Sequence, residues 1–411
     1  MTAISSEGQE TMSDPATSPA SPLSSPGAAE MVLSGVRIVT ASEVIEDGYL
    51  RVARGRIAEV AAGAPPVAGE ERRYHLAGHT VLPGLIDLHV HGGGGSTYTD
   101  GDPTQVARAV AYHRRAGTTT TLASLVTAPV RDLVQALEGL AVLTEDGTIA
   151  GVHLEGPFLA PSHCGAQDPH SLLEPDISVL HELLAAGQGA VRMVTIAPEL
   201  PGAIGLIEAC REAGVIVAIG HSNATYAEAS SAIDAGATVA THLGNAMRSI
   251  HQREPGIVVA ALERPEVTCE LISDGHHLSA AIIRLFARAA VGGVALVSDA
   301  ISAAGAPDGH YRLGPLLVEV SGSHAYLEGT RTIAGSTLTT GAAVAYCVRE
   351  AGLPLLEVAR AAAGAPAAVL GIADRVGSIA PGKQADLVVL DEVLATRAVI
   401  RAGALEVGTL D

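Results

Sequence analysis

The feature that most constrains this chain is an alternation of apolar runs and helical stretches through its middle. Eight runs typical of buried strands lie at 81–90, 118–126, 149–155, 191–197, 215–220, 237–242, 267–273 and 294–299. Helical stretches follow them, for example over 103–116, 203–213, 226–235 and 280–290. Ala-Gly pairs at 116–117, 213–214 and 235–236 are typical helix ends. This repeated unit predicts an α/β protein with a (β/α)8 TIM-like barrel over residues 87–375.

A doubly wound open sheet is the alternative fold for the same alternation. That fold favours a glycine-rich phosphate loop with G-x-G-x-x-G spacing after its first strand. The glycines in that place, Gly92 to Gly95, form an unbroken run without that spacing. We therefore expect the barrel.

Both ends of the chain follow a different pattern, in which short β runs are separated by tight turns. Such runs lie at 32–40, 48–53 and 57–61, and again at 387–390 and 398–402. They predict a small, discontinuous β-sandwich domain built from residues 31–86 and 376–411. Residues 1–30 are rich in Ser, Pro and Ala and lack Lys and Arg, so we expect a disordered tail, with Met31 as a candidate native start.

Composition excludes several classes of partner. The formal charge of −19 argues against nucleic acid and anionic membranes, and an aromatic content of 2% argues against base or sugar stacking. No apolar run approaches the roughly 18–20 residues of a membrane helix. The 4 cysteines are scattered without a C-x-x-C pair, which favours a reducing, cytoplasmic location. We expect a small-molecule substrate.

Ionisable residues stand at the ends of six predicted strands. In a barrel, these ends form the active-site face. His89 and His91 are two residues apart, so both side chains point to one side of a strand. A single histidine at a strand end is interpreted as structural, as His153 is here. Burying many ionisable groups without partners would cost the fold too much stability for that interpretation to hold for all of them. We predict a site for zinc, iron, cobalt or manganese made by His89, His91, Glu155, His221, His242 and Asp299.

Sequence motifs around these residues resemble a known family. Residues 83–92, PGLIDLHVHG, resemble the first-strand signature of the amidohydrolase superfamily. The segments HLEGPF at 153–158, GHSNA at 220–224, THLGNAM at 241–247 and SDA at 298–300 narrow this to the family of N-acetylglucosamine-6-phosphate deacetylases. The resemblance spans about residues 32–405. It implies metal-dependent hydrolysis of the acetamido group of N-acetylglucosamine 6-phosphate, giving glucosamine 6-phosphate and acetate in amino-sugar catabolism.

The same resemblance implies roles for single residues. Glu155, His221 and His242 would hold one divalent ion, and His89 and His91 a second, so the cofactor would be one or two ions, zinc before iron, cobalt or manganese. Asp299 would act as general base and then as general acid.

The substrate contacts implied by the resemblance lie in two loops. The backbone of Ala246 and the side chains of Asn245 and His277 would contact the sugar phosphate. Arg253 matches an arginine that reaches the neighbouring subunit's site, which implies a homodimer. Residues 242–253 contain His242, Arg248, His251 and Arg253 but no acidic residue, so this loop is basic within an acidic chain.

The loop after Glu155 departs from the family pattern. Gln167, expected to contact substrate, stands where the family normally has histidine, and glutamine donates a hydrogen bond but carries no proton charge near neutral pH. Three interpretations stay open: a catalytically weakened paralogue, a deacetylase of N-acetylgalactosamine 6-phosphate, or one of another N-acyl compound. Cys164 in the same loop is interpreted either as a bystander or as a redox-sensitive thiol that gates the site.

Overall fold

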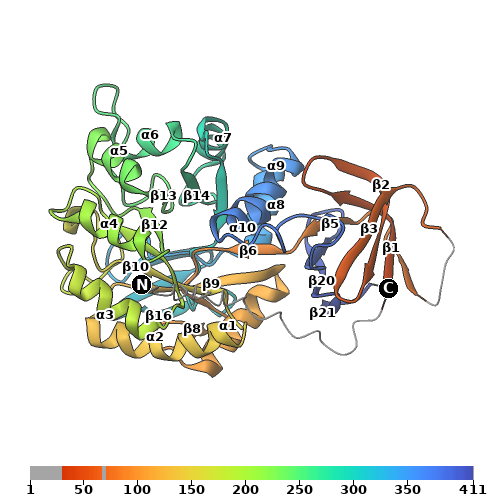
Figure 1. Ribbon diagram of the computed structural model, residues 1–411, viewed down its shortest axis with the longest axis horizontal. Coiled ribbons are helices and arrows are strands. Elements are labelled where there is room, and N and C mark those ends of the chain that lie inside the picture. The colour runs from red at the N-terminus through yellow and green to blue at the C-terminus, as the bar shows by residue number, and fades with distance from the viewer. Residues whose placement is uncertain (1–29, 67–70, 411) are drawn as a thin grey trace, which may run out of the picture.

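Two large sheets organise the chain and lie side by side (Figure 1). The computed structural model describes residues 30–66 and 71–410, so the predicted disordered tail lies, except for Glu30, outside the described residues. One sheet forms the barrel, and the other combines strands from the beginning and the end of the chain. Among the described residues, no helix has both the length and the apolarity needed to span a bilayer.

The barrel sheet has eight parallel strands in chain order. They are β6 (Leu85–Asp87), β9 (Thr118–Val126), β10 (Gly151–Glu155), β11 (Val191–Ile196), β12 (Ile216–Ile219), β13 (Ala237–Ala240), β14 (Thr268–Ile272) and β15 (Val294–Val297). The first and last strands meet just beyond their ends, where the Asp299 N–H donates to the His89 carbonyl at 2.8 Å. Inward-facing apolar residues such as Leu122, Met193 and Val239 fill the interior. The predicted fold class is confirmed.

Helices surround this barrel (Figure 1). They are α1 (Pro103–Arg115), α2 (Val130–Glu145), α3 (Ile177–Gly187), α4 (Ala203–Glu212), α5 (Tyr226–Ala235), α6 (Gly256–Glu263), α7 (Ala280–Ala289), α8 (Thr340–Arg349), α9 (Leu355–Ala359) and α10 (Ala365–Val369). Local sequence sets their ends: Thr225 and Glu228 form a capping box on α5, and Asp102 caps α1. The buried stripe Leu133, Leu137 and Leu140 packs α2 on the barrel.

The second sheet joins the two ends of the chain. Its strand order is β21 (Ala404–Gly408), β20 (Thr396–Arg401), β19 (Leu387–Leu390), β5 (Thr80–Pro83), β1 (Met31–Val39), β2 (Val44–Ala53) and β3 (Arg56–Ala62), with β4 (Arg72–His75) paired to β1. The two ends meet where β19 runs antiparallel to β5. Its core includes Leu33, Leu50 and Ile400. The domain boundaries at 86/87 and 375/376 stay a prediction.

Two small sheets were not foreseen from the sequence. Between β15 and α8, strands β16 (Gly309–Leu313), β17 (Leu316–Ser321) and β18 (His324–Leu327) form an antiparallel sheet with its own core, including Val318 and Val320. The alternation of apolar and polar residues over 318–321, ending at Gly322, was a readable strand-and-turn signal. The short strands β7 (Gly92–Gly93) and β8 (Ser96–Thr97) follow the first barrel strand.

Candidate metal centre

Six side chains proposed from the sequence as metal ligands meet at the carboxyl ends of the barrel strands. Glu155 ends β10, and the other five follow β6, β12, β13 and β15 within four residues. All six are buried. His221, His242 and Asp299 have positive φ angles of 47°, 28° and 49°. Such backbone conformations are strained in non-glycine residues and are concentrated at functional sites.

One ligand group consists of Glu155, His221 and His242. The Nε2 atoms of His221 and His242 lie 3.0 and 3.1 Å from Glu155 Oε1. The two Nε2 atoms are 3.0 Å apart. Three donor atoms from three strands therefore surround one point.

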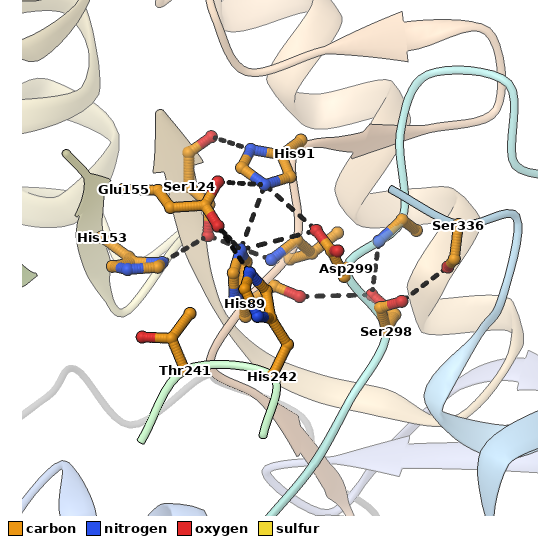
Figure 2. Close-up of polar contacts among 12 residues, drawn as sticks. His89, His91, Ser124, His153, Glu155, Thr241, His242, Ser298, Asp299 and Ser336 are labelled. Atoms are coloured by element: carbon orange, nitrogen blue, oxygen red, sulfur yellow. Dashed lines mark hydrogen bonds and ion pairs between the residues drawn. The ribbon is translucent and has the colours of Figure 1, made fainter. Parts of the chain in front are cut away.

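A second ligand group consists of His89, His91 and Asp299 (Figure 2). The Nε2 atoms of His89 and His91 are 3.1 Å apart, and Asp299 Oδ1 lies 3.5 and 3.2 Å from them. Glu155 lies between the groups, because its Oε2 is 3.3 Å from His91 Nε2 while its Oε1 faces His221 and His242. The two carboxylate oxygens of Glu155 thus face different ligand groups.

The chemistry of these donors fits divalent cations. Imidazole nitrogen and carboxylate oxygen are ligands for zinc, iron, cobalt and manganese. Burial lowers the pKa of His91, but hydrogen bonds to Asp299 and Glu155 raise it to about 9. Burial raises the pKa of Glu155, whereas the neighbouring His89 and His221 bring it well below its usual range. The buried carboxylates are therefore stable in their ionised form only beside positive charge, which protonated imidazoles or metal ions can supply.

Outer hydrogen bonds orient three of the four imidazoles. His91 Nδ1 donates to the Ser124 carbonyl at 3.1 Å, and His221 Nδ1 donates to the His163 carbonyl at 3.0 Å. His89 Nδ1 donates to Glu270 Oε2 at 3.1 Å. Each bond leaves the Nε2 lone pair facing the centre. Sequence reasoning missed Glu270, although an acidic residue inside the apolar segment Thr268–Ile272 was a signal.

A cavity of about 460 Å³ opens onto the metal centre. Its lining includes the predicted substrate contacts Gln167, Asn245, Ala246 and His277. It also includes Arg331, Thr332 and Ile333, which follow β18 and which sequence reasoning missed because the small sheet was not foreseen. Arg331 is the one lysine or arginine among the described residues that line this cavity.

Gln167 contacts the proposed ligand Glu155 directly. Its Nε2 donates to Glu155 Oε2 at 2.5 Å, and its Oε1 accepts from the Thr127 N–H at 2.7 Å. The side chain is 4% exposed. Gln167 therefore holds the Glu155 carboxylate while lining the cavity. Cys164 is half-buried in the same loop and is not part of the lining, although the adjacent Gly165 is.

His277 is fixed by a neighbouring carboxylate. Its Nδ1 donates to Asp274 Oδ2 at 2.7 Å, which leaves Nε2 free to contact a ligand. Burial raises the pKa of Asp274, but the hydrogen bond and charge of His277 bring it below its usual range. His276, which the sequence leaves with a structural role, instead hydrogen-bonds through Nε2 to Ser323 Oγ at 2.7 Å, on the turn between β17 and β18.

Arg253 is placed differently from the other predicted substrate contacts. It lies on the exposed loop between β13 and α6 and does not line the cavity of its own chain. Arg248 in the same loop is engaged by Asn223 Oδ1 at 3.1 Å and Glu254 Oε2 at 3.4 Å. The role that the sequence predicts for Arg253 in a neighbouring subunit stays a prediction.

Comparisons with known proteins agree with this architecture. Residues 80–404 match the amidohydrolase family. An N-acetylgalactosamine-6-phosphate deacetylase from Escherichia coli O157:H7 is 36% identical over 88% of this chain and 96% of its own length. An N-acetylglucosamine-6-phosphate deacetylase from Bacillus subtilis is 32% identical over 88% of this chain and 93% of its own. The crystal structure of N-acetyl-D-glucosamine-6-phosphate deacetylase from Mycobacterium smegmatis is 45% identical, with a TM-score of 0.87 over 92% of this chain and 100% of that one.

Proposed function

The chain belongs to the amidohydrolase family, and we propose that it removes the acetyl group from N-acetylglucosamine 6-phosphate. It is a hydrolase that acts on an amide. The observation that carries the proposal is the convergence of two ligand groups, one of which includes Asp299, beneath one cavity. The products would be acetate and glucosamine 6-phosphate, in amino-sugar catabolism.

Asp299 is the proposed proton carrier. Burial raises its pKa, but the charge of His89 and the hydrogen bond to His91 bring the pKa below its ordinary value, so the carboxylate is ionised near neutral pH. A divalent ion held by this centre lowers the pKa of water and polarises a carbonyl. Asp299 takes a proton as the water oxygen bonds to the acetyl carbon. It returns that proton to the amide nitrogen as the C–N bond breaks.

The cavity supports recognition by polar groups. Its volume lies within the roughly 300–1,000 Å³ typical of small-molecule sites, and its described lining contains no Phe, Tyr or Trp. Asn245, the Ala246 backbone and His277 would bind the sugar phosphate, with Arg331 supplying positive charge from the same chain. Arg253 from a second copy would complete the site in a homodimer.

The remaining assignments follow from the donor set and the thiols. We place zinc first among the metals. Iron, cobalt and manganese are the alternatives, because nitrogen and oxygen donors accept all four. We place the protein in the cytoplasm, because all four cysteines are free.

N-acetylgalactosamine 6-phosphate is the second candidate substrate. The Escherichia coli relative named for that activity is 36% identical to this chain. Gln167 also differs from the histidine expected at its position. The weakened-paralogue interpretation has less support, because every proposed metal ligand is in place.

Acetate release from a panel of N-acetyl sugars tests the proposal. We expect turnover of N-acetylglucosamine 6-phosphate with kcat/KM about 10²-fold above that of unphosphorylated N-acetylglucosamine, because charged hydrogen bonds to phosphate are lost in the latter. Faster turnover of N-acetylgalactosamine 6-phosphate would select the second candidate. No acetate from either phosphate with any of the four metals would reject both. Gln167→His on the same panel shows whether the glutamine limits the rate.

A further inference from the structure

We propose that Glu270 is a positioning residue that makes His89 a metal ligand and thereby allows the centre to hold a second ion. This inference rests on the proposed metal centre. Glu270 lies on β14 and its side chain is fully buried. Its Oε2 is 3.1 Å from His89 Nδ1 and 3.2 Å from the His242 backbone nitrogen, and it accepts from both.

The bond to Glu270 fixes which nitrogen of His89 faces the centre. With its proton on Nδ1, His89 presents the Nε2 lone pair, which lies 3.1 Å from His91 Nε2 and 3.3 Å from Glu155 Oε1. A flipped or rotated ring would withdraw this donor, leaving His91 and Asp299 alone in the second ligand group. The bond from His89 to Glu270 therefore acts on the ligand group of His89, His91 and Asp299, whereas the second contact of Glu270 is to the backbone of His242.

His89 is also the one imidazole of the four whose outer acceptor is a carboxylate. His91 and His221 donate to backbone carbonyls, and His242 Nδ1 has no partner among the described residues. A carboxylate acceptor raises the basicity of the ligating nitrogen more than a neutral carbonyl does. Glu270 thus strengthens His89 as a ligand as well as orienting it.

Packing does not explain a carboxylate at this position. Its strand neighbours Cys269 and Leu271 are both buried, and a buried charged group is costly unless it is paired. Its other oxygen, Oε1, has no hydrogen-bond partner among the described residues. The contacts that Glu270 Oε2 makes are to His89 and to the backbone of His242, so its observed partners belong to the metal centre.

Substitution of Glu270 should change the metal affinity of the two ligand groups by different amounts. The loop that carries His242 is also held by the Leu243 N–H, which donates to the Glu270 carbonyl at 2.8 Å, a backbone bond that any substitution retains. Loss of an outer carboxylate typically weakens metal binding about 10–100-fold. We expect that loss at the second ion, while the first ion, held by Glu155, His221 and His242, keeps close to its wild-type affinity.

The test uses the full-length protein, stripped of metal by chelation and titrated with manganese(II) chloride. Equilibrium dialysis with metal analysis gives the number and affinity of bound ions, and electron paramagnetic resonance detects a spin-coupled manganese pair. Wild type should bind two ions and show the coupled signal. Glu270→Leu should bind one ion at the concentration that fills both in wild type, without the coupled signal. Glu270→Gln, which keeps an acceptor oxygen but not the charge, should bind the second ion with intermediate affinity.

Asp386→Asn is the matched control, because Asp386 is a buried carboxylate that hydrogen-bonds to Gln384 and the Ala402 N–H, away from the ligands. It should bind both ions as wild type does. The proposal is overturned if Glu270→Leu binds the second ion as tightly as wild type does. It is also overturned if Asp386→Asn weakens binding of that ion equally, or if wild type binds a single ion. If Glu270→Leu does not fold, unchanged second-ion affinity in Glu270→Gln overturns it. Absent acetate release from two-ion wild type would instead contradict the proposed function alone.

Discussion

At the residue scale, the centre depends on turns placed directly after the barrel strands. His221, His242 and Asp299 each follow a strand end and adopt a positive φ. The positive φ ends the extended strand geometry at the residue that presents its side chain to the centre. The conformation costs on the order of 1–3 kcal/mol for each non-glycine residue, which the surrounding structure must offset.

Asp299→Asn tests the assigned proton carrier. Asparagine keeps the shape of the side chain but cannot accept the proton, so kcat should fall about 10²–10⁴-fold. Acetate release measures the fall, and metal analysis should still find the ion held by Glu155, His221 and His242. If the turnover of Asp299→Asn stays within a few-fold of wild type, Asp299 is not the general base.

Gln167→Leu tests the role of the loop glutamine. The change removes the donor to Glu155 and the acceptor of the Thr127 N–H, both at a buried position. We expect kcat to fall about 10²-fold, in the range seen when a preorganised polar contact is removed from an active site. Steady-state kinetics with full metal loading measures this, and an unchanged kcat would show that the contact is dispensable.

Thiol labelling tests the environments of the four cysteines. Burial raises the pKa of Cys210 and Cys269 to about 12 and that of Cys347 to about 11, and it also raises the pKa of Cys164, whose side chain however is only half-buried and so can be reached by a reagent. A thiol reagent at pH 8 should therefore modify Cys164 alone in the folded protein. Cys164→Ser should abolish the reaction, and rapid labelling of a second thiol would contradict these burial assignments. Equal inactivation of both proteins by peroxide would remove the redox-gate interpretation of Cys164.

The proposed ligands were visible in the sequence because each is local to a strand end. Glu270 was not identified, because its function depends on His89, 181 residues away, and only the closed barrel brings the two together. Gln167 was identified as a substrate contact, yet its bonds to Glu155 and Thr127 could not be read from spacing.

At the element scale, strand and helix periodicity predicted the barrel, while the small sheet of β16, β17 and β18 was missed. Short apolar runs between β15 and α8 do not fit the repeating unit, and their pairing depends on tertiary packing against residues such as Val126 and Ile301. This sheet matters for function, because the segment that follows β18 brings Arg331 to the cavity.

Arg331→Ala tests the contribution of that segment. Arg331 is exposed and has no hydrogen bond or ion pair within the described chain, so its charge is available to a ligand. KM for the sugar phosphate should rise about 10-fold, with a smaller change in kcat, because a charged hydrogen bond to substrate is lost. Arg312→Ala, on β16 and outside the cavity lining, is the control. If both variants raise KM equally, or if neither changes it, Arg331 does not contact the substrate.

At the scale of the whole molecule, the sheet made from both ends of the chain anchors the first barrel strand. β5 belongs to that sheet and leads through Gly84 to β6, after which His89 and His91 follow. A Cβ at Gly84 would lie 2.3 Å from the Thr119 hydroxyl oxygen, so only glycine fits where the two sheets join. The sequence predicted this pairing of the ends from their shared β pattern, but not which strands would meet.

Mixing two inactive variants tests whether a second copy completes the site. Arg253→Ala and Asp299→Asn should each be impaired alone, but a mixed dimer has one site with both residues intact. We expect an equal mixture, after subunit exchange, to recover about a quarter of wild-type activity. No recovery in verified mixed dimers, or a fully active monomer, would contradict the contribution of Arg253 to a neighbouring site.

Acetate release from N-acetylglucosamine 6-phosphate, measured before chelation, after chelation and after zinc is restored, tests the central claim most directly. The converging ligand groups predict that acetate forms, stops when metal is removed and returns when zinc is added. Turnover that persists in verified metal-free protein, or no acetate after zinc, iron, cobalt or manganese is restored, would contradict a metal-dependent deacetylase.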